Sequence, residues 1–123
     1  MKRLWKAALI ITTVLAGSLA LAGSWASNHA FTAGAVAVTN TQANSAWAPV
    51  AVLVRYAAPA AGTVTVHRAS AGVLYTLAVC AFTNAQTVVW IPEAPYVFEP
   101  GDALLIGSSE TNGVVQVIRK GGG

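Results

Sequence analysis

The sequence predicts an all-β domain, an antiparallel β-sandwich or small barrel built as a meander of about seven to eight strands, after an N-terminal hydrophobic helix. Three observations predict it. From Gly34 onward, β-branched residues alternate with small or polar ones, and this period of two places successive side chains on opposite faces of a sheet. Turn-forming residues recur at short, fairly even intervals. One uncharged apolar run precedes these features.

The first 26 residues form a basic, hydrophobic leader. Three cations precede an uncharged run from Ala7 to Gly23, which is the plan of a signal peptide with small residues for cleavage after Ala22 or Ala26. Extended over residues 7–26, the run also has the roughly 20 residues of a membrane-spanning anchor. A third interpretation is an apolar helix buried in an assembly such as a virion. The sequence leaves all three open.

The rest of the chain divides by composition. Residues 27–48 are interpreted as a linker and a first strand, because 24–33 and 40–48 are rich in Ser, Thr, Asn and Gln. Residues 49–120 form the predicted β-sandwich domain, and residues 121–123 are a flexible tail of glycines.

The first predicted hairpin joins strands at 49–57 and 63–68 through a turn at Ala58 to Gly62. Strand alternation directs Val64 and Val66 inward. It places three polar side chains together on the outer face: Thr63, Thr65 and His67.

Further turn signals predict the remaining strands. Ala71-Gly72 leads into a strand at 73–82, and Asn84-Ala85 leads into one at 86–91. Pro92 to Pro95 ends that strand, because proline removes a donor from the hydrogen-bonding ladder. These consecutive turns predict a meander.

Two turns organise the C-terminal third. Glu99 to Asp102 fits a type II turn between short strands at 96–98 and 103–108, since proline presets φ at its second position and glycine supplies positive φ at its third. Asn-Gly is a strong hairpin signal and leads into a strand at 114–120. The turn-defining residues are Pro100, Gly101, Asp102, Asn112 and Gly113.

Charge is scarce in this chain. Hydrophobic residues make up 55% of it and charged residues 9%, so little opposes association. Beyond the leader four cations balance four acids, and no basic stripe is present to neutralise phosphates. We therefore expect no direct nucleic-acid binding, and we expect the partners to be copies of the chain itself and other subunits of an assembly.

The residue types that carry catalysis and metal binding are few. His29, His67 and Cys80 do not supply the four ligands of a Cys and His zinc site, and a single cysteine forms no intramolecular disulfide. Neither histidine lies in a recognisable nucleophilic motif, and the acids Glu99 and Asp102 flank one turn. The sequence predicts no enzyme, no cofactor and no metal.

The candidate interaction surface consists of Trp47, Tyr96 and His67. The two aromatic residues border predicted loops, where a ring can stack on a ligand, whereas Trp90 and Phe98 sit in apolar strands and are expected in the core. His67 on an exposed strand face is either an ordinary surface residue or a pH switch. Cys80 is expected to be a small buried hydrophobe.

The stretch from Val50 to Lys120 resembles small β-sandwich proteins of tailed-bacteriophage virions. The resemblance rests on the Glu99-Pro100-Gly101-Asp102 turn, the strand Ala103 to Ile106 after it, the Ser108-Ser109 step and Trp90-Ile91-Pro92. It implies an accessory head, neck or tail protein that assembles symmetrically through exposed β-surface. The leader departs from that pattern.

Two functional hypotheses follow. The first is a non-enzymatic virion subunit that self-assembles. The second is an exported β-sandwich binding or adhesion module, either secreted or anchored at the outer face of the inner membrane, with membrane contact through residues 7–26.

Overall fold

The computed structural model describes residues 24–121, and these residues form six strands. The expectations for the hydrophobic leader lie mostly outside the described residues. Within the described part of the chain, no helix has the length and apolar character to cross a membrane. The strands are β1 (Ser24–Ala30), β2 (Ala35–Thr39), β3 (Ala48–Ser70), β4 (Val73–Trp90), β5 (Ala103–Ser108) and β6 (Gly113–Lys120).

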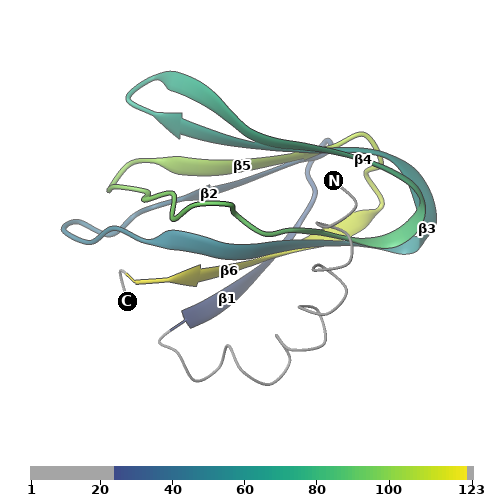
Figure 1. Cartoon of the computed structure of the whole chain (residues 1–123), viewed down its shortest axis with the longest axis horizontal. Coiled ribbons are helices and arrows are strands. Elements are labelled where there is room, and N and C mark those ends of the chain that lie inside the picture. Colours follow the sequence, from purple (N-terminus) through teal and green to yellow (C-terminus); the bar gives the residue numbers. More distant parts are fainter. Residues whose placement is uncertain (1–23, 122–123) are drawn as a thin grey trace.

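A single antiparallel sheet curls over itself into two facing layers (Figure 1). The strand order is β1-β6-β3-β5-β2, and β4 pairs with β3. Both long strands serve both layers, because residues 48–56 of β3 pair with β6 whereas residues 64–69 pair with β5. We call β1, β6 and the adjoining ends of β3 and β4 the lower layer, and β2, β5 and the other halves of β3 and β4 the upper layer. The all-β, antiparallel sandwich prediction is confirmed.

The connectivity differs from the predicted meander. Only β3 and β4 are both consecutive in the chain and paired with each other. Two of the predicted turns, at Ala58 to Gly62 and at Asn84-Ala85, lie inside continuous strands. There the hairpin bends from one layer to the other, and register shifts between Arg55 and Gly62, together with a φ of 50° at Asn84, absorb the bend. The turn-forming residues therefore mark a corner of the sheet.

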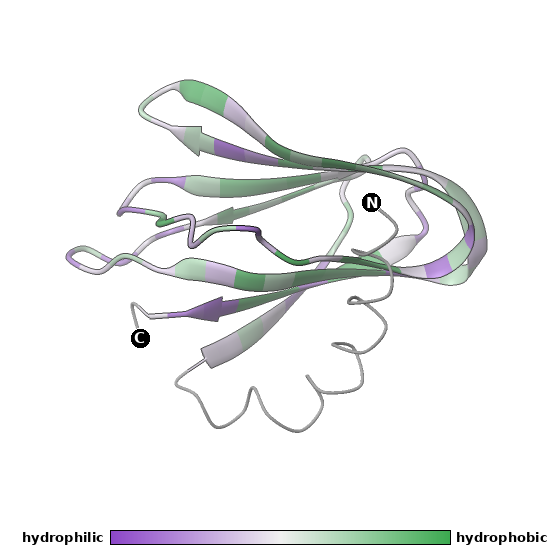
Figure 2. Ribbon diagram, viewed as in Figure 1, coloured by the Kyte–Doolittle hydropathy of each residue, from purple (hydrophilic) through white to green (hydrophobic). Residues whose placement is uncertain are grey.

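The core lies between the layers. Alternation holds where it was predicted: Val64 and Val66 are 1% and 0% exposed, whereas Thr65 and His67 between and beside them are half-buried on the outer face. Figure 2 shows hydrophobic residues along the inner stretches of the strands. The cluster comprises Val36, Val38, Trp47, Val52, Val54, Tyr56, Val64, Val66, Cys80, Phe82, Val88, Trp90, Phe98, Leu104, Ile106, Val115 and Val117.

Residues 24–30 form a strand where polar composition predicted a linker. β1 pairs with β6 from Ser24 opposite Lys120 to Ala30 opposite Val114. Trp25, Ser27 and His29 are half-buried while the residues between them are exposed. The covered face carries the polar Ser27 and His29, where Ser27 Oγ lies 2.8 Å from His29 Nε2 and accepts from Arg119 at 3.1 Å, so this strand lacks the alternation of apolar and polar residues that predicts one.

The Asn112-Gly113 hairpin prediction is wrong. Neither residue has positive φ, and β5 and β6 belong to different layers instead of pairing. Gly113 serves a close approach, because a Cβ atom there would lie 2.7 Å from the carbonyl oxygen of Arg55. Its lack of a side chain is required by packing at the corner and not by turn geometry.

The other turns have the following geometry. Ala71 and Gly72 close the β3 and β4 hairpin with φ of 51° and 79°. Gly101 has φ of 91°, and the N–H of Asp102 donates to the carbonyl of Glu99 at 2.9 Å, as in a type II turn. The segment expected as a strand at 96–98 makes only a bridge between Phe98 and Trp47.

Candidate interaction surface

Trp47 is a core residue, and its prediction as a binding residue is wrong. Its side chain is 2% exposed and lies parallel to Phe98, with ring centroids 4.8 Å apart and planes inclined by 4°. Two backbone hydrogen bonds join the same two residues, at 3.1 and 2.8 Å. This bridge holds Trp47 against Phe98, so its ring is buried although its neighbours in the sequence are polar.

Arginines extend this aromatic pair at both ends. The guanidinium carbon of Arg119 lies 5.0 Å from the ring centroids of both Trp25 and Trp47, and that of Arg68 lies 5.3 Å from Phe98. Burial lowers the pKa of Arg119. Because such contacts are attractive within about 6 Å, the stack connects the two layers at one end of the sandwich.

Asp102 anchors the upper end of this stack. Its Oδ2 accepts from Arg68 at 3.1 Å and from the backbone N–H of Glu99 at 2.9 Å. Burial alone raises its pKa, but hydrogen bonds from Ser70, Glu99 and Arg68 outweigh burial and hold the pKa below its ordinary value. The carboxylate therefore closes a turn and neutralises a partly buried arginine.

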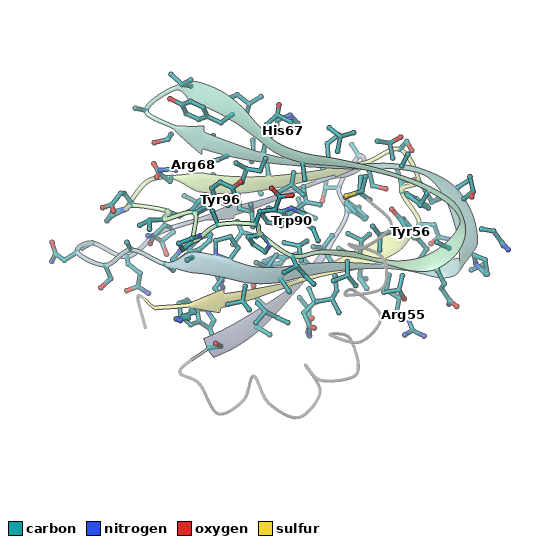
Figure 3. The ribbon with its side chains drawn as sticks, in the orientation of Figure 1. Arg55, Tyr56, His67, Arg68, Trp90 and Tyr96 are labelled. Atoms are coloured by element: carbon teal, nitrogen blue, oxygen red, sulfur yellow. The ribbon has the colours of Figure 1, made fainter. Side chains whose placement is uncertain are left out.

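Tyr96 and His67 lie in different places. Tyr96 is half-buried between the layers and stacks on Trp90, with centroids 6.2 Å apart (Figure 3). His67 lies on the upper layer and faces outward. The structure therefore does not bring Trp47, Tyr96 and His67 together into one surface.

Both histidines instead line one shallow hollow of about 500 Å³. The small residues Ala35, Ala37 and Gly107 line it, and Thr65 adds a hydroxyl group. The Nε2 atom of His29 lies 2.8 Å from Ser27 Oγ, and desolvation followed by repulsion from Arg119 lowers the pKa of His29. Among the described residues, no group of three or more His, Cys, Asp or Glu side chains is placed to hold a metal ion.

Cys80 is buried on β4, 4% exposed, with its partner Val64 across the ladder. Burial raises the pKa of its thiol. The expectation of a small buried hydrophobe is confirmed.

The prominent surface feature of β4 was missed at the sequence level. Four apolar side chains on this strand are about half exposed: Val73 (48%), Leu74 (57%), Tyr75 (51%) and Val79 (53%). The tip of the β3 and β4 hairpin bends away from β5 in the upper layer, and Figure 2 colours part of it as hydrophobic. One sequence signal pointed here, since no Asp, Glu, Lys or Arg occurs between Arg68 and Glu93.

The outer face of the upper layer shares this lack of charge. The register places Leu74, Thr76 and Val79 of β4 on the same face as His67 and Thr65. The outward positions of β2, β5 and this half of β3 are Ala, Thr, Leu, Gly and the single His67. None of these positions carries Asp, Glu, Lys or Arg. The face is therefore apolar to weakly polar, and it is continuous with the hairpin tip.

Neither a family model nor a curated protein matches the chain. Solved structures match its fold. The core of Drosophila NLP, studied for pentamer formation and histone binding, is 11% identical with a TM-score of 0.50, covering 80% of this chain and 96% of that one. The nucleoplasmin-like N-terminal domain of Drosophila FKBP39 is 17% identical with a TM-score of 0.43, covering 82% and 90%. The family 32 carbohydrate-binding module of C. perfringens NanJ, in complex with galactose, is 8% identical with a TM-score of 0.44, covering 78% and 93%. At 11% identity the likeness to the NLP core shows a shared fold alone.

Proposed function

We propose that this protein is a non-enzymatic structural subunit that assembles with copies of itself. In its more specific form, the proposal is an accessory head, neck or tail component of a tailed-bacteriophage virion, as the resemblance over Val50 to Lys120 implies. Localisation in a virion is part of this proposal.

The uncharged surface of the upper layer carries the proposal. Half-exposed valine, leucine and tyrosine side chains on β4 adjoin a sheet face without Asp, Glu, Lys or Arg. Soluble monomers seldom leave contiguous apolar surface uncovered, and contiguous surface of this kind marks contact with other macromolecules. Covering it with a neighbouring subunit removes that surface from water, which stabilises an assembly.

The use of the polar side chains supports a structural role. Asp102 already accepts from Arg68 and from the Glu99 backbone, and the hydroxyl of Tyr56 hydrogen-bonds with Ser108 Oγ at 2.7 Å. Burial raises the pKa of Tyr56. These groups join strands and turns to one another, which is the function expected of them in a scaffold.

Sedimentation velocity of the full-length chain tests self-assembly. We expect species whose masses are multiples of 12.6 kDa and whose proportion rises with concentration. A chain that stays monomeric across the accessible concentration range refutes the proposal. Mass spectrometry of purified phage particles from the source culture tests the virion assignment, and absence of the chain from particles refutes that part.

One observation favours the second candidate, an exported binding module. The hollow of about 500 Å³ between His29 and His67 has the concave form that a small ligand requires. A monomeric mature chain without its leader, in which this hollow binds a ligand, would support that function over assembly.

A further inference from the structure

The half of β4 from Val73 to Phe82 has one unpaired edge. On one side it pairs with β3, from Val73 opposite Ser70 to Phe82 opposite Gly62. On its other side no strand of the described chain is present. In an antiparallel ladder, backbone N–H and C=O groups point alternately to the two sides, so those on the free side have no partner within the sheet.

This edge has little protection against pairing. Proteins usually block a free edge with charged residues, proline, a bulge or a very short strand. The stretch from Val73 to Phe82 contains no charged residue and no proline, and its only such device is the irregularity at Leu77, where the register shifts. The outermost strands β2 and β1 have 5 and 7 residues, so β4 offers a longer free edge than either.

The chemistry of this edge matches a second copy of itself. Unpaired ladder groups require an extended strand as partner, and an identical strand supplies one of equal length. Without charge on either strand, antiparallel pairing brings no like charges together, and a charged peptide would find no complementary charge. Antiparallel pairing also sets the apolar tip of each hairpin, Val73 to Tyr75, beside the Phe82 end of its partner, where that tip becomes covered.

We propose that two copies of this chain associate by antiparallel pairing of their β4 edges about a two-fold axis, which joins their upper layers into one continuous sheet. This inference rests on the proposed self-assembly and names the surface that performs it. A two-fold contact is self-complementary, so one substitution changes it in both copies.

The test compares matched lysine substitutions in the full-length chain. Val79→Lys places a charge on the β4 edge strand, at a side chain that is 53% exposed. Val114→Lys is the control, since Val114 is 51% exposed but lies on β6 between β1 and β3 in the lower layer. Thr76→Lys, also at an exposed position of β4, is a second edge variant in case the first does not fold. Circular dichroism verifies folding, and sedimentation velocity measures the dimer dissociation constant.

The two-fold dimer contains Val79 twice, and we expect each lysine to raise the dimer dissociation constant by about tenfold. Val79→Lys should therefore weaken dimerisation by about 100-fold. Val114→Lys should change the dissociation constant by less than about threefold. Mixing Val79→Lys with Thr76→Glu should restore association, because this register sets residue 79 of one copy opposite residue 76 of the other, where the opposite charges meet.

The outcomes separate the two proposals. A monomeric wild-type chain overturns both. A wild-type oligomer that withstands both edge variants overturns only the β4 pairing, and self-assembly then uses another surface. Loss of association with Val79→Lys that the Thr76→Glu mixture does not reverse overturns the two-fold contact between identical edges.

Discussion

Replacing Asp102 by asparagine tests whether the buried carboxylate supports the sandwich as the structure indicates. Asp102 is 5% exposed, and its Oδ2 accepts from Arg68 and from the Glu99 backbone. Asparagine keeps the shape and one acceptor oxygen, so the turn can still close. It removes the charge that faces Arg68, whose side chain is 27% exposed.

The expected loss is about 2 kcal/mol of unfolding free energy near neutral pH. A hydrogen bond to a charged group contributes roughly 1.5 to 3 kcal/mol, and solvent reaching Arg68 reduces the loss. Urea unfolding followed by tryptophan fluorescence measures it, since Trp47 and Trp90 are buried. Glu99→Gln is the matched control, because it makes the same chemical change at an exposed side chain of the same turn and should cost less than about 0.5 kcal/mol.

The pH dependence gives a second, independent readout. The folded-state pKa of Asp102 lies below its ordinary value, so its ionisation stabilises the fold above the unfolded-state pKa. That contribution is lost as pH falls through the folded-state pKa. The difference between wild type and Asp102→Asn should therefore be largest at neutral pH and shrink in acid. A difference that does not change with pH, or an equal loss in Glu99→Gln, would contradict the role assigned to Asp102.

Two further predictions concern the turns and the first strand. Gly101→Ala should lower the free energy of unfolding by about 1 to 2 kcal/mol, measured by thermal or urea unfolding, because Gly101 has a φ of 91°. Asn112→Ala, at a residue without positive φ, should change this free energy by less than about 0.5 kcal/mol. The reverse order would show that the turn geometry is misassigned. If the leader is removed, N-terminal sequencing should find Gly23 first and not Ser27, because cleavage before Ser27 would remove Trp25 and the beginning of β1 from the sandwich.

Alternation predicted which side chains face inward wherever a strand has one buried and one solvent-facing side. Val64 and Val66 are buried and Thr65 is not, as a period of two requires. The same argument failed for Ser24 to Ala30, because the half-buried face of this edge strand carries the polar Ser27 and His29 and its exposed face carries two alanines. It also failed at Ala58 to Gly62 and at Asn84, because a sharp bend in a continuous hairpin uses the same residues as a turn.

The candidate surface was less predictable than the fold. Trp47 lies next to polar residues in sequence, and only its pairing with Phe98, distant in the chain, shows that it is buried. The hydrophobic residues of β4 look like core residues by pattern alone. Their exposure follows from their place on β4, which pairs with β3 alone, and from the hairpin tip, which bends away from β5.

The sequence by itself determined that this chain forms an antiparallel β-sheet structure, that its body has no net charge, and that the stretch between Arg68 and Glu93 carries no charge at all. Only the tertiary structure decided which strands are neighbours, which aromatic rings are covered, and which edge remains unpaired. The reason is physical: the alternation of side chains is a local property of each strand, whereas burial and pairing depend on segments brought together from distant parts of the chain.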